Sequence, residues 1–138
     1  MAESSGRHAR EEKRARSRIL VIEDDEAVRR FLRQALENAG YQVIVGKDGH
    51  EGLSLYRESP TDLIITDIVM PGMDGLAVIM ELQTEFPESR LIAISGGNDM
   101  VANEMLNMAE KFGAFRTLQK PFSVSVLLDA VREALESK

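Results

Sequence analysis

The chain has 138 residues, 43% of them hydrophobic and none of them Cys, and its formal net charge is −6. This length suits one compact domain with a normal core, and the lack of Cys excludes disulfides, thiolate nucleophiles and the usual zinc clusters. No apolar run approaches the roughly 18 residues that cross a bilayer, and no signal-peptide core follows the N-terminus, so we expect a cytoplasmic protein without membrane insertion.

Residues 1–18 differ in composition from the rest of the chain. They contain six Lys or Arg, three Glu and no aromatic residue. This composition predicts a disordered charged tail, with a weak contact to a polyanion or a partner as the alternative. The remaining residues 19–138 are then distinctly acidic, so we expect no direct binding of nucleic acid, which an acidic surface repels.

From residue 19 onward, short β-branched runs alternate with segments of helical period. This alternation is typical of an α/β fold with a parallel sheet. The runs are mostly continuous and apolar, which indicates strands covered on both faces. The predicted strands are residues 19–22, 41–45, 63–66, 91–94 and 115–118.

Helices are predicted near residues 28–39, 51–58, 76–85 and 100–112, and from Ser123 to the end. Gly40 is placed for a left-handed C-terminal cap and Ser123 for an N-cap. In the first helix, three arginines are expected to face mostly outward: Arg29, Arg30 and Arg33. The fourth helix is expected to bury Val101, Met105, Met108 and Phe112. The last is expected to present to the sheet Val124, Leu127, Leu128, Val131 and Leu135.

Polar side chains follow four of the five predicted strands. In an open parallel sheet, the carboxyl ends of the strands share the edge where ligands bind. Each residue alone has an ordinary explanation as a capping or turn residue, but together they predict one site. They are Glu23, Asp24 and Asp25 after the first strand, Asp67 after the third, Ser95 after the fourth and Lys120 after the fifth.

The chemistry of this predicted site follows from its donors. Crowded carboxylates raise one another's pKa unless a cation lies among them, and oxygen donors without Cys or paired His favour Mg²⁺. A carboxylate beside Mg²⁺ can attack phosphorus, and Asp67 is the best placed candidate. Lys120 and the hydroxyl of Ser95 would stabilise charge on the transferring oxygens.

Four segments carry a resemblance to a known family: ILVIEDDE at 19–26, ITDIVMPGMDG at 65–75, IAISGG at 92–97 and LQKPF at 118–122. On these motifs, residues 18–137 resemble the receiver domain of two-component response regulators, of the stand-alone single-domain type. The resemblance implies a flavodoxin-like, doubly wound parallel sheet of five strands in the order 2-1-3-4-5 with five helices. The expected organisation is a tail at 1–18 and a receiver domain at 19–138.

The resemblance also implies roles for single residues. Asp67 would accept the phosphoryl group, Ser95 and Lys120 would contact it, and the bond from Lys120 to Pro121 would be cis. Mg²⁺ would be held by three carboxylates and one backbone carbonyl, those of Glu23, Asp24, Asp67 and Val69.

The partners that the resemblance implies are proteins. A sensor histidine kinase or a histidine phosphotransfer protein would donate the phosphoryl group, and a downstream target would dock on the fourth helix, fifth strand and fifth helix. The chain would catalyse only its own phosphorylation and dephosphorylation, and would not otherwise be an enzyme.

Two departures from the family pattern matter. Thr117 stands where the family usually has Tyr or Phe, and Phe115 either replaces that aromatic residue or serves packing. Val69 and Gly97 replace polar groups that often position the attacking water, so we expect slow self-dephosphorylation.

Two other functions stay open. A receiver fold could bind proteins without phosphorylation, although the complete set of site residues favours the switch. A Mg²⁺-dependent phosphatase would normally carry a second acid at the position of Val69.

Overall fold

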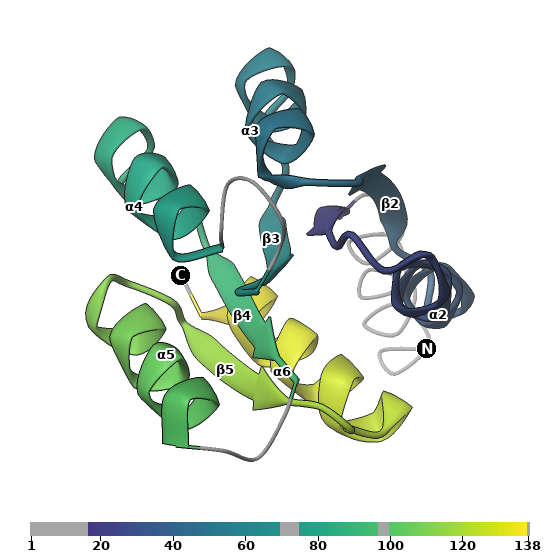
Figure 1. Ribbon diagram of the computed structural model, residues 1–138. Coiled ribbons are helices and arrows are strands. Elements are labelled where there is room, and N and C mark those ends of the chain that lie inside the picture. The colour runs from purple at the N-terminus through teal and green to yellow at the C-terminus, as the bar shows by residue number, and fades with distance from the viewer. Residues whose placement is uncertain (1–16, 70–74, 97–99, 138) are drawn as a thin grey trace.

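The computed structural model describes residues 17–69, 75–96 and 100–137, with side chains from residue 103 onward in the last range. Expectations that concern residues 1–16, the segment 70–74, Gly97 or the side chain of Val101 lie outside the described residues. The elements, labelled as in Figure 1, are β1 (Arg18–Ile22), α2 (Glu26–Asn38), β2 (Gln42–Gly46), α3 (Gly49–Glu58), β3 (Leu63–Asp67), α4 (Gly75–Glu85), β4 (Leu91–Ser95), α5 (Met100–Lys111), β5 (Arg116–Gln119) and α6 (Val124–Glu136).

The five strands form one parallel sheet in the order β2-β1-β3-β4-β5, which confirms the predicted fold class and strand order. Helices α2 and α6 cover one face, and α3, α4 and α5 cover the other. The first strand begins one residue earlier than expected, at Arg18, whose backbone N–H donates to Asp62 at 2.8 Å. It therefore takes in the last residue of the segment that was expected to be a tail.

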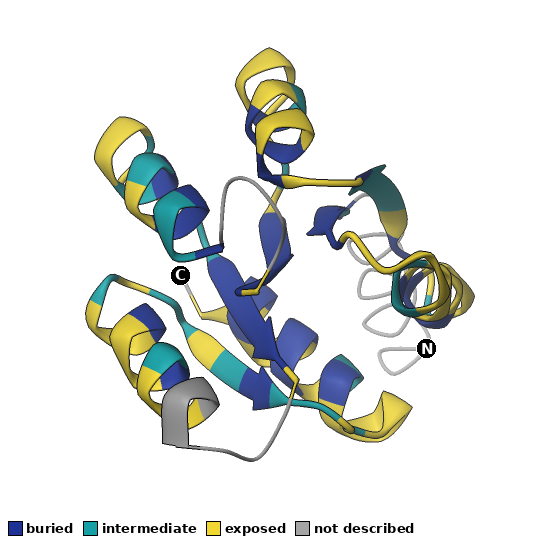
Figure 2. Ribbon diagram, viewed as in Figure 1, coloured by how far each residue is buried: buried dark blue, intermediate teal, exposed yellow. Residues whose placement is uncertain are grey.

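Successive residues of the central strands serve two separate cores. In β1, Ile19 and Val21 pack toward α2 and α6, whereas Leu20 and Ile22 pack toward α3 and α4. All four are at most 1% exposed, and every residue of β3 and β4 is buried (Figure 2). Burial on both faces explains the continuous apolar runs, and each such side chain contributes about 1.5–3 kcal/mol to folding.

The helix ends follow local chemistry. The carboxylate of Asp25 accepts hydrogen bonds from the first turn of α2, and the hydroxyl of Ser123 accepts one from Val126 at the start of α6. Gly40 follows α2 with a φ of 100°, a value that glycine adopts without strain. The predicted caps at Gly40 and Ser123 are thus confirmed. Among the described residues, no helix is both long and apolar enough to span a bilayer.

Two predicted core positions are wrong. Met108 in α5 is 42% exposed, whereas Leu106 and Ala109 are buried, the two buried side chains among residues 103–111 of that helix. Met108 lies two positions after Leu106, about 200° around the helix, so the two cannot share a face. Val124, the first residue of α6, is 41% exposed, while Leu127, Leu128, Val131 and Leu135 pack in the core as expected.

Candidate functional site

Sheet pairing brings two acids from distant parts of the chain together. β1 and β3 are neighbours, and Ile22 pairs with Thr66. The next residues, Glu23 and Asp67, therefore lie side by side at the carboxyl edge of the sheet. The backbone N–H of Glu23 donates to the carbonyl of Gly46 at the end of β2, at 3.1 Å. The edge predicted from the strand ends is thus the edge at which the acids meet.

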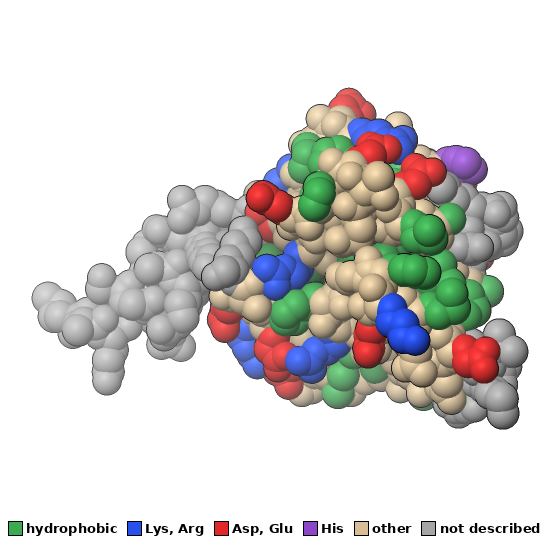
Figure 3. Space-filling view, turned by 90° about the vertical axis from the view of Figure 1, so that its left-hand side faces the viewer, with side chains coloured by type: hydrophobic (Ala, Val, Ile, Leu, Met, Phe, Trp, Pro, Cys, Tyr) green, Lys and Arg blue, Asp and Glu red, His purple; other side chains and the backbone are tan. Residues whose placement is uncertain are grey.

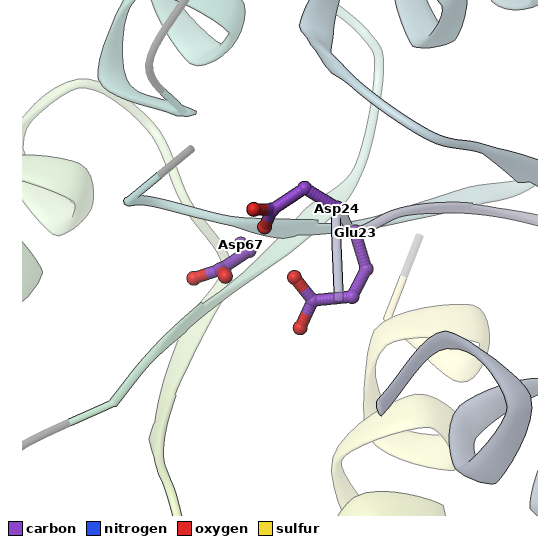
Figure 4. Close-up of side chains that lie close together, drawn as sticks. All are labelled: Glu23, Asp24 and Asp67. Carbon is purple, nitrogen blue, oxygen red and sulfur yellow. The ribbon is translucent and has the colours of Figure 1, made fainter. Parts of the chain in front are cut away.

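Three carboxylates converge at this edge. Glu23, Asp24 and Asp67 each offer an oxygen, and these oxygens all lie within 4.8 Å of one another (Figure 4). Glu23 is 1% exposed and Asp67 is 6% exposed, whereas Asp24 is open to solvent. The cluster therefore combines two buried anions with one that remains accessible from outside.

Lys120 reaches the cluster from the far side of β4. Its Nζ donates to Oε1 of Glu23 at 2.8 Å and to Oδ2 of Asp67 at 3.4 Å. Its backbone N–H donates to the carbonyl of Ser95 at 2.7 Å, which holds the residue at the end of β5 against β4. The bond from Lys120 to Pro121 is cis, as expected.

Burial and neighbouring charges shift the pKa values of Glu23, Asp24 and Lys120. Burial raises the pKa of Glu23 above its ordinary value and Asp67 raises it further, against the opposing effect of Lys120. Although Asp24 is largely exposed, partial burial of its carboxyl group and the nearby Glu23 raise its pKa as well. Burial alone would lower the pKa of Lys120, but its bond to Glu23 and the charge of Asp67 outweigh that effect and raise it. One ammonium group thus faces three carboxylates.

The donor set fits a hard divalent cation. All three side chains offer oxygen, which Mg²⁺ and Ca²⁺ prefer. In addition, Oε2 of Glu23 is buried and has no hydrogen-bond partner among the described residues. Because buried polar atoms rarely stay unsatisfied, this oxygen and the two neighbouring carboxylates are suited to hold such an ion.

Ser95 and Val69 flank Asp67. Ile94 pairs with Asp67 across the sheet, which places Ser95 one residue beyond it, fully buried. The hydroxyl of Ser95 donates to the carbonyl of Gly96 at 3.3 Å. Val69 is 56% exposed, and its backbone N–H donates to Oδ1 of Asp67 at 3.3 Å. The structure therefore brings all the predicted site residues to one edge, while the ligand role of the Val69 carbonyl stays a prediction.

Asp25 does not join the cluster of acids. Its Oδ1 accepts hydrogen bonds from the backbone N–H groups of Ala27 and Val28, at 2.9 and 3.1 Å. It is therefore occupied as the N-cap of α2, which explains why two adjacent acids, Asp24 and Asp25, have different surroundings.

Sequence reasoning missed two residues of the site. Arg29 was expected to face outward, but it is partly buried and donates to the carbonyl of Glu23 at 2.9 Å. Gly75, which the sequence shows only as the last residue of the motif at 65–75, begins α4, and a Cβ on it would lie 2.1 Å from the carbonyl oxygen of Asp67. The position of Gly75 in the MPGMDG motif was the one available signal, whereas nothing in the sequence distinguished Arg29 from Arg30.

The position of the usual aromatic residue is polar in this chain. The hydroxyl of Thr117 donates to Oε1 of Glu110 in α5 at 3.0 Å. Phe115 precedes β5 and packs with the core on the α2 and α6 face, with the guanidinium of Arg90 over its ring at 5.1 Å. Phe115 therefore serves packing and does not take the place of an aromatic side chain at Thr117.

The strand order, with acids at the point between β1 and β3 where that order reverses, is that of an α/β protein with a candidate ligand site at the carboxyl edge of its sheet. More specifically, the chain belongs to the response regulator receiver domain family, whose family model matches residues 19–132. This match confirms the resemblance seen in the sequence.

Relatives include longer proteins of two kinds. Sensor kinase CckA of Brucella abortus is 35% identical over 122 residues, which cover 87% of this chain and 13% of that protein. Response regulator MprA of Mycolicibacterium vanbaalenii is 35% identical over 118 residues, covering 86% of this chain and 50% of MprA. The chain thus spans at most half the length of these curated relatives.

The fold also matches solved receiver domains. The receiver domain of NtrX from Brucella abortus superimposes with a TM-score of 0.82 at 28% sequence identity, covering 87% of this chain and 99% of that domain. The match to nearly the whole of a solved receiver domain agrees with the strand order and helix placement described above.

Proposed function

We propose that this receiver domain acts as a phosphoacceptor switch. Asp67 takes a phosphoryl group from a phosphohistidine donor, and the reaction depends on Mg²⁺ bound by Glu23, Asp24 and Asp67. The observation that supports this proposal most is the placement of Asp67, which is 6% exposed, 3.4 Å from an ammonium group and within 4.8 Å of two further carboxylates.

The transfer is a substitution at phosphorus. A carboxylate oxygen of Asp67 forms the new bond to phosphorus while the bond to the donor nitrogen breaks, and the imidazole, protonated on its other nitrogen, leaves as the neutral ring. Bound Mg²⁺ supplies charge neutralisation for the attacking carboxylate and the phosphoryl oxygens. Lys120 and the hydroxyl of Ser95 stabilise the charge that spreads over the equatorial oxygens.

Two protein partners complete the proposal. A sensor histidine kinase or a histidine phosphotransfer protein supplies the phosphoryl group, and a downstream protein docks on the face formed by α5, β5 and α6. On the side of the molecule shown in Figure 3, acidic, basic and apolar side chains lie interspersed. Such a mixed surface suits a protein partner better than nucleic acid.

A protein-binding module that works without phosphorylation is the alternative. It needs no acceptor, so it gives no reason for a buried Glu23 with an unsatisfied oxygen beside Asp67. A phosphatase acting on other molecules is less well supported, because Val69 stands where a second acid would assist the leaving group. We infer that the chain catalyses only reactions on itself.

The decisive experiment is a mass measurement. The protein is incubated with Mg²⁺ and a small phosphodonor such as acetyl phosphate, alongside Asp67→Asn and the control Asp129→Asn, which alters an exposed acid of α6. We expect the parent and the control to gain one phosphoryl mass and Asp67→Asn to gain none. If the parent gains no mass, the protein-binding module is favoured. If Asp67→Asn gains one phosphoryl mass, a residue other than Asp67 is the acceptor.

The lifetime of the phosphorylated protein is a separate part of the proposal. Val69 is an exposed apolar residue two positions after the acceptor, and it offers no side-chain hydrogen bond to an attacking water. We expect self-dephosphorylation to be slow, and Val69→Asn to shorten the lifetime. A phosphoprotein that decays within seconds in Mg²⁺ buffer contradicts this expectation.

A further inference from the structure

Arg29 contacts the backbone that carries the two acids of the first loop. Its Nη1 donates to the carbonyl of Glu23 at 2.9 Å and lies 3.4 Å from the carbonyl of Asp24. The neighbouring Arg30 is different: its side chain is 74% exposed and pairs with Glu26 one turn earlier in α2. One of two adjacent arginines therefore holds the acid-bearing loop and the other faces solvent.

The position of Asp24 depends on that backbone. The N–H of Glu23 is held by the carbonyl of Gly46 at 3.1 Å, and the C=O of Glu23 is held by Arg29 at 2.9 Å. The peptide groups on both sides of Glu23 are thus fixed. Asp24 itself is exposed, so packing does little to orient its side chain, and the path of the backbone decides where its carboxylate lies.

We propose that Arg29 is a positioning residue for the divalent cation. It holds the carbonyls of Glu23 and Asp24 so that their carboxylates stay beside Asp67. This inference rests on the proposed function in one respect, namely that Mg²⁺ binds these three acids. A guanidinium suits the task because its geometry is planar and rigid and its Nη1 carries two hydrogens, so that this one nitrogen can donate to both carbonyls.

The energetic reason lies in the mutual repulsion of the carboxylates. Like charges at this distance disfavour one another, so a loop that is free to move would relax away from Asp67 in the absence of the ion. Binding of the ion would then also have to bring the carboxylates back together, which would lower the affinity for Mg²⁺. Residues that orient metal ligands without touching the metal typically change metal affinity by about 10-fold to 100-fold.

A purely electrostatic role for Arg29 predicts the opposite sign. Removing a positive charge near an anionic site increases its attraction for Mg²⁺, so loss of the charge alone would tighten binding. Loss of the hydrogen bonds to the loop would weaken it. The direction of the change therefore separates positioning from charge.

The test compares Arg29→Gln with Arg30→Gln by isothermal titration calorimetry with Mg²⁺. Both variants remove one positive charge from the same turn of α2. We expect Arg29→Gln to raise the Kd for Mg²⁺ about tenfold, Arg29→Lys to fall in between, and Arg30→Gln to bind as the parent does or slightly tighter. Far-UV circular dichroism checks that α2 is intact, and faster hydrogen exchange of the Glu23 amide in Arg29→Gln reports the loosened loop.

The inference is overturned if Arg29→Gln binds Mg²⁺ as tightly as Arg30→Gln. Failure of the switch itself would look different: the parent would take up Mg²⁺ but gain no phosphoryl mass, and the calorimetric comparison would still decide the role of Arg29. A parent that takes up no Mg²⁺ overturns both this inference and the metal dependence of the proposed function.

Discussion

The ammonium group of Lys120 lies 2.8 Å from a carboxylate oxygen of Glu23, although the two residues are 97 positions apart in the chain. Glu23 is almost completely buried and its second oxygen has no hydrogen-bond partner among the described residues. Lys120 is thus the cation that offsets a buried negative charge, and it also contacts Asp67. The side chain of Lys120 therefore has two effects: it stabilises the folded domain through Glu23, and it lies against the proposed acceptor Asp67.

Replacing Lys120 by Met should destabilise the protein in metal-free buffer. The change leaves Glu23 buried without its partner, which costs about 2 kcal/mol of unfolding free energy after allowance for the partial exposure of Lys120. Urea unfolding with a chelator measures the loss, and added Mg²⁺ should reduce it. Lys47→Met, at an exposed lysine, is the control and should change stability by less than about 0.5 kcal/mol. If Lys120→Met and Lys47→Met lose the same free energy of unfolding, Lys120 does not stabilise the buried Glu23.

Two adjacent acids should separate metal binding from folding. Asp24→Asn removes one charged oxygen donor and should weaken Mg²⁺ binding by about tenfold or more. Asp25→Ala removes the N-cap of α2 and should lower the free energy of unfolding by about 1 kcal/mol, with little effect on Mg²⁺ affinity. Calorimetric titration and thermal unfolding of both variants check the two effects. If Asp25→Ala lost Mg²⁺ binding as fully as Asp24→Asn, the assignment of Asp24 to metal binding and of Asp25 to helix capping alone would be wrong.

Gly75 should not tolerate a side chain. A Cβ at this position would lie 2.1 Å from the carbonyl oxygen of Asp67 and 2.5 Å from Cα of Ile68. Because both are backbone atoms, Gly75→Ala should cost about 1–3 kcal/mol and displace the acceptor, lowering its phosphorylation rate. Gly96→Ala is the matched control, since among the described residues its Cβ would meet only the side chain of Lys120, at 3.7 Å. Similar unfolding midpoints for the two variants count against this account.

The hydrogen bond between Thr117 and Glu110 should couple β5 to α5. Its length is 3.0 Å and it is exposed, so we expect a coupling energy of about 0.5–1 kcal/mol. A double-mutant cycle of Thr117→Val and Glu110→Ala, followed by denaturant unfolding, isolates this value from the effects of each single change. Additive effects would show that the bond contributes nothing in solution.

Stability should depend on pH through Glu23. The pKa of Glu23 is raised above its ordinary value of 4.5 in the folded chain. The protonated Glu23 therefore adds to the free energy of unfolding, fully below about pH 4.5, and this contribution is lost as the pH rises through the raised pKa. Glu23→Gln cannot ionise, so in metal-free buffer it should gain stability over the parent across this range. The pKa of Lys120 is raised from 10.5, so Lys120 stays charged throughout. The measurement is the free energy of unfolding of Glu23→Gln and of the parent at several pH values. If the difference between the two proteins does not change with pH, the prediction is wrong.

Much of the fold could be read from local patterns in the chain. The five apolar runs predicted the strands, and each strand differs from its predicted range by one residue at one end or at both ends. The caps at Gly40 and Ser123 were predicted because each depends on the conformation or hydrogen bonding of adjacent residues. The gathering of acids at one edge followed from the parallel sheet, since strand ends of one kind share one side.

The errors arose where orientation depends on distant packing. Met108 fits an apolar stripe by spacing, yet the sheet packs against Leu106 and Ala109. The sequence does not distinguish Arg29 from its neighbour Arg30, because both are arginines in the same turn of α2. Only the direction of α2 relative to the first loop brings Arg29 close to two backbone carbonyls.

The sequence by itself determined the class of fold, the ends of the elements to within two residues, and the identity of the acids, Lys120 and Ser95, because periodicity, caps and donor chemistry are local properties. Tertiary structure alone decided which distant partner each of three groups meets: Lys120 contacts Glu23, Arg29 contacts the backbone of the first loop, and Gly75 packs against the backbone of Asp67. Such contacts depend on how strands and helices far apart in the chain are oriented in space, and a linear pattern does not specify those orientations.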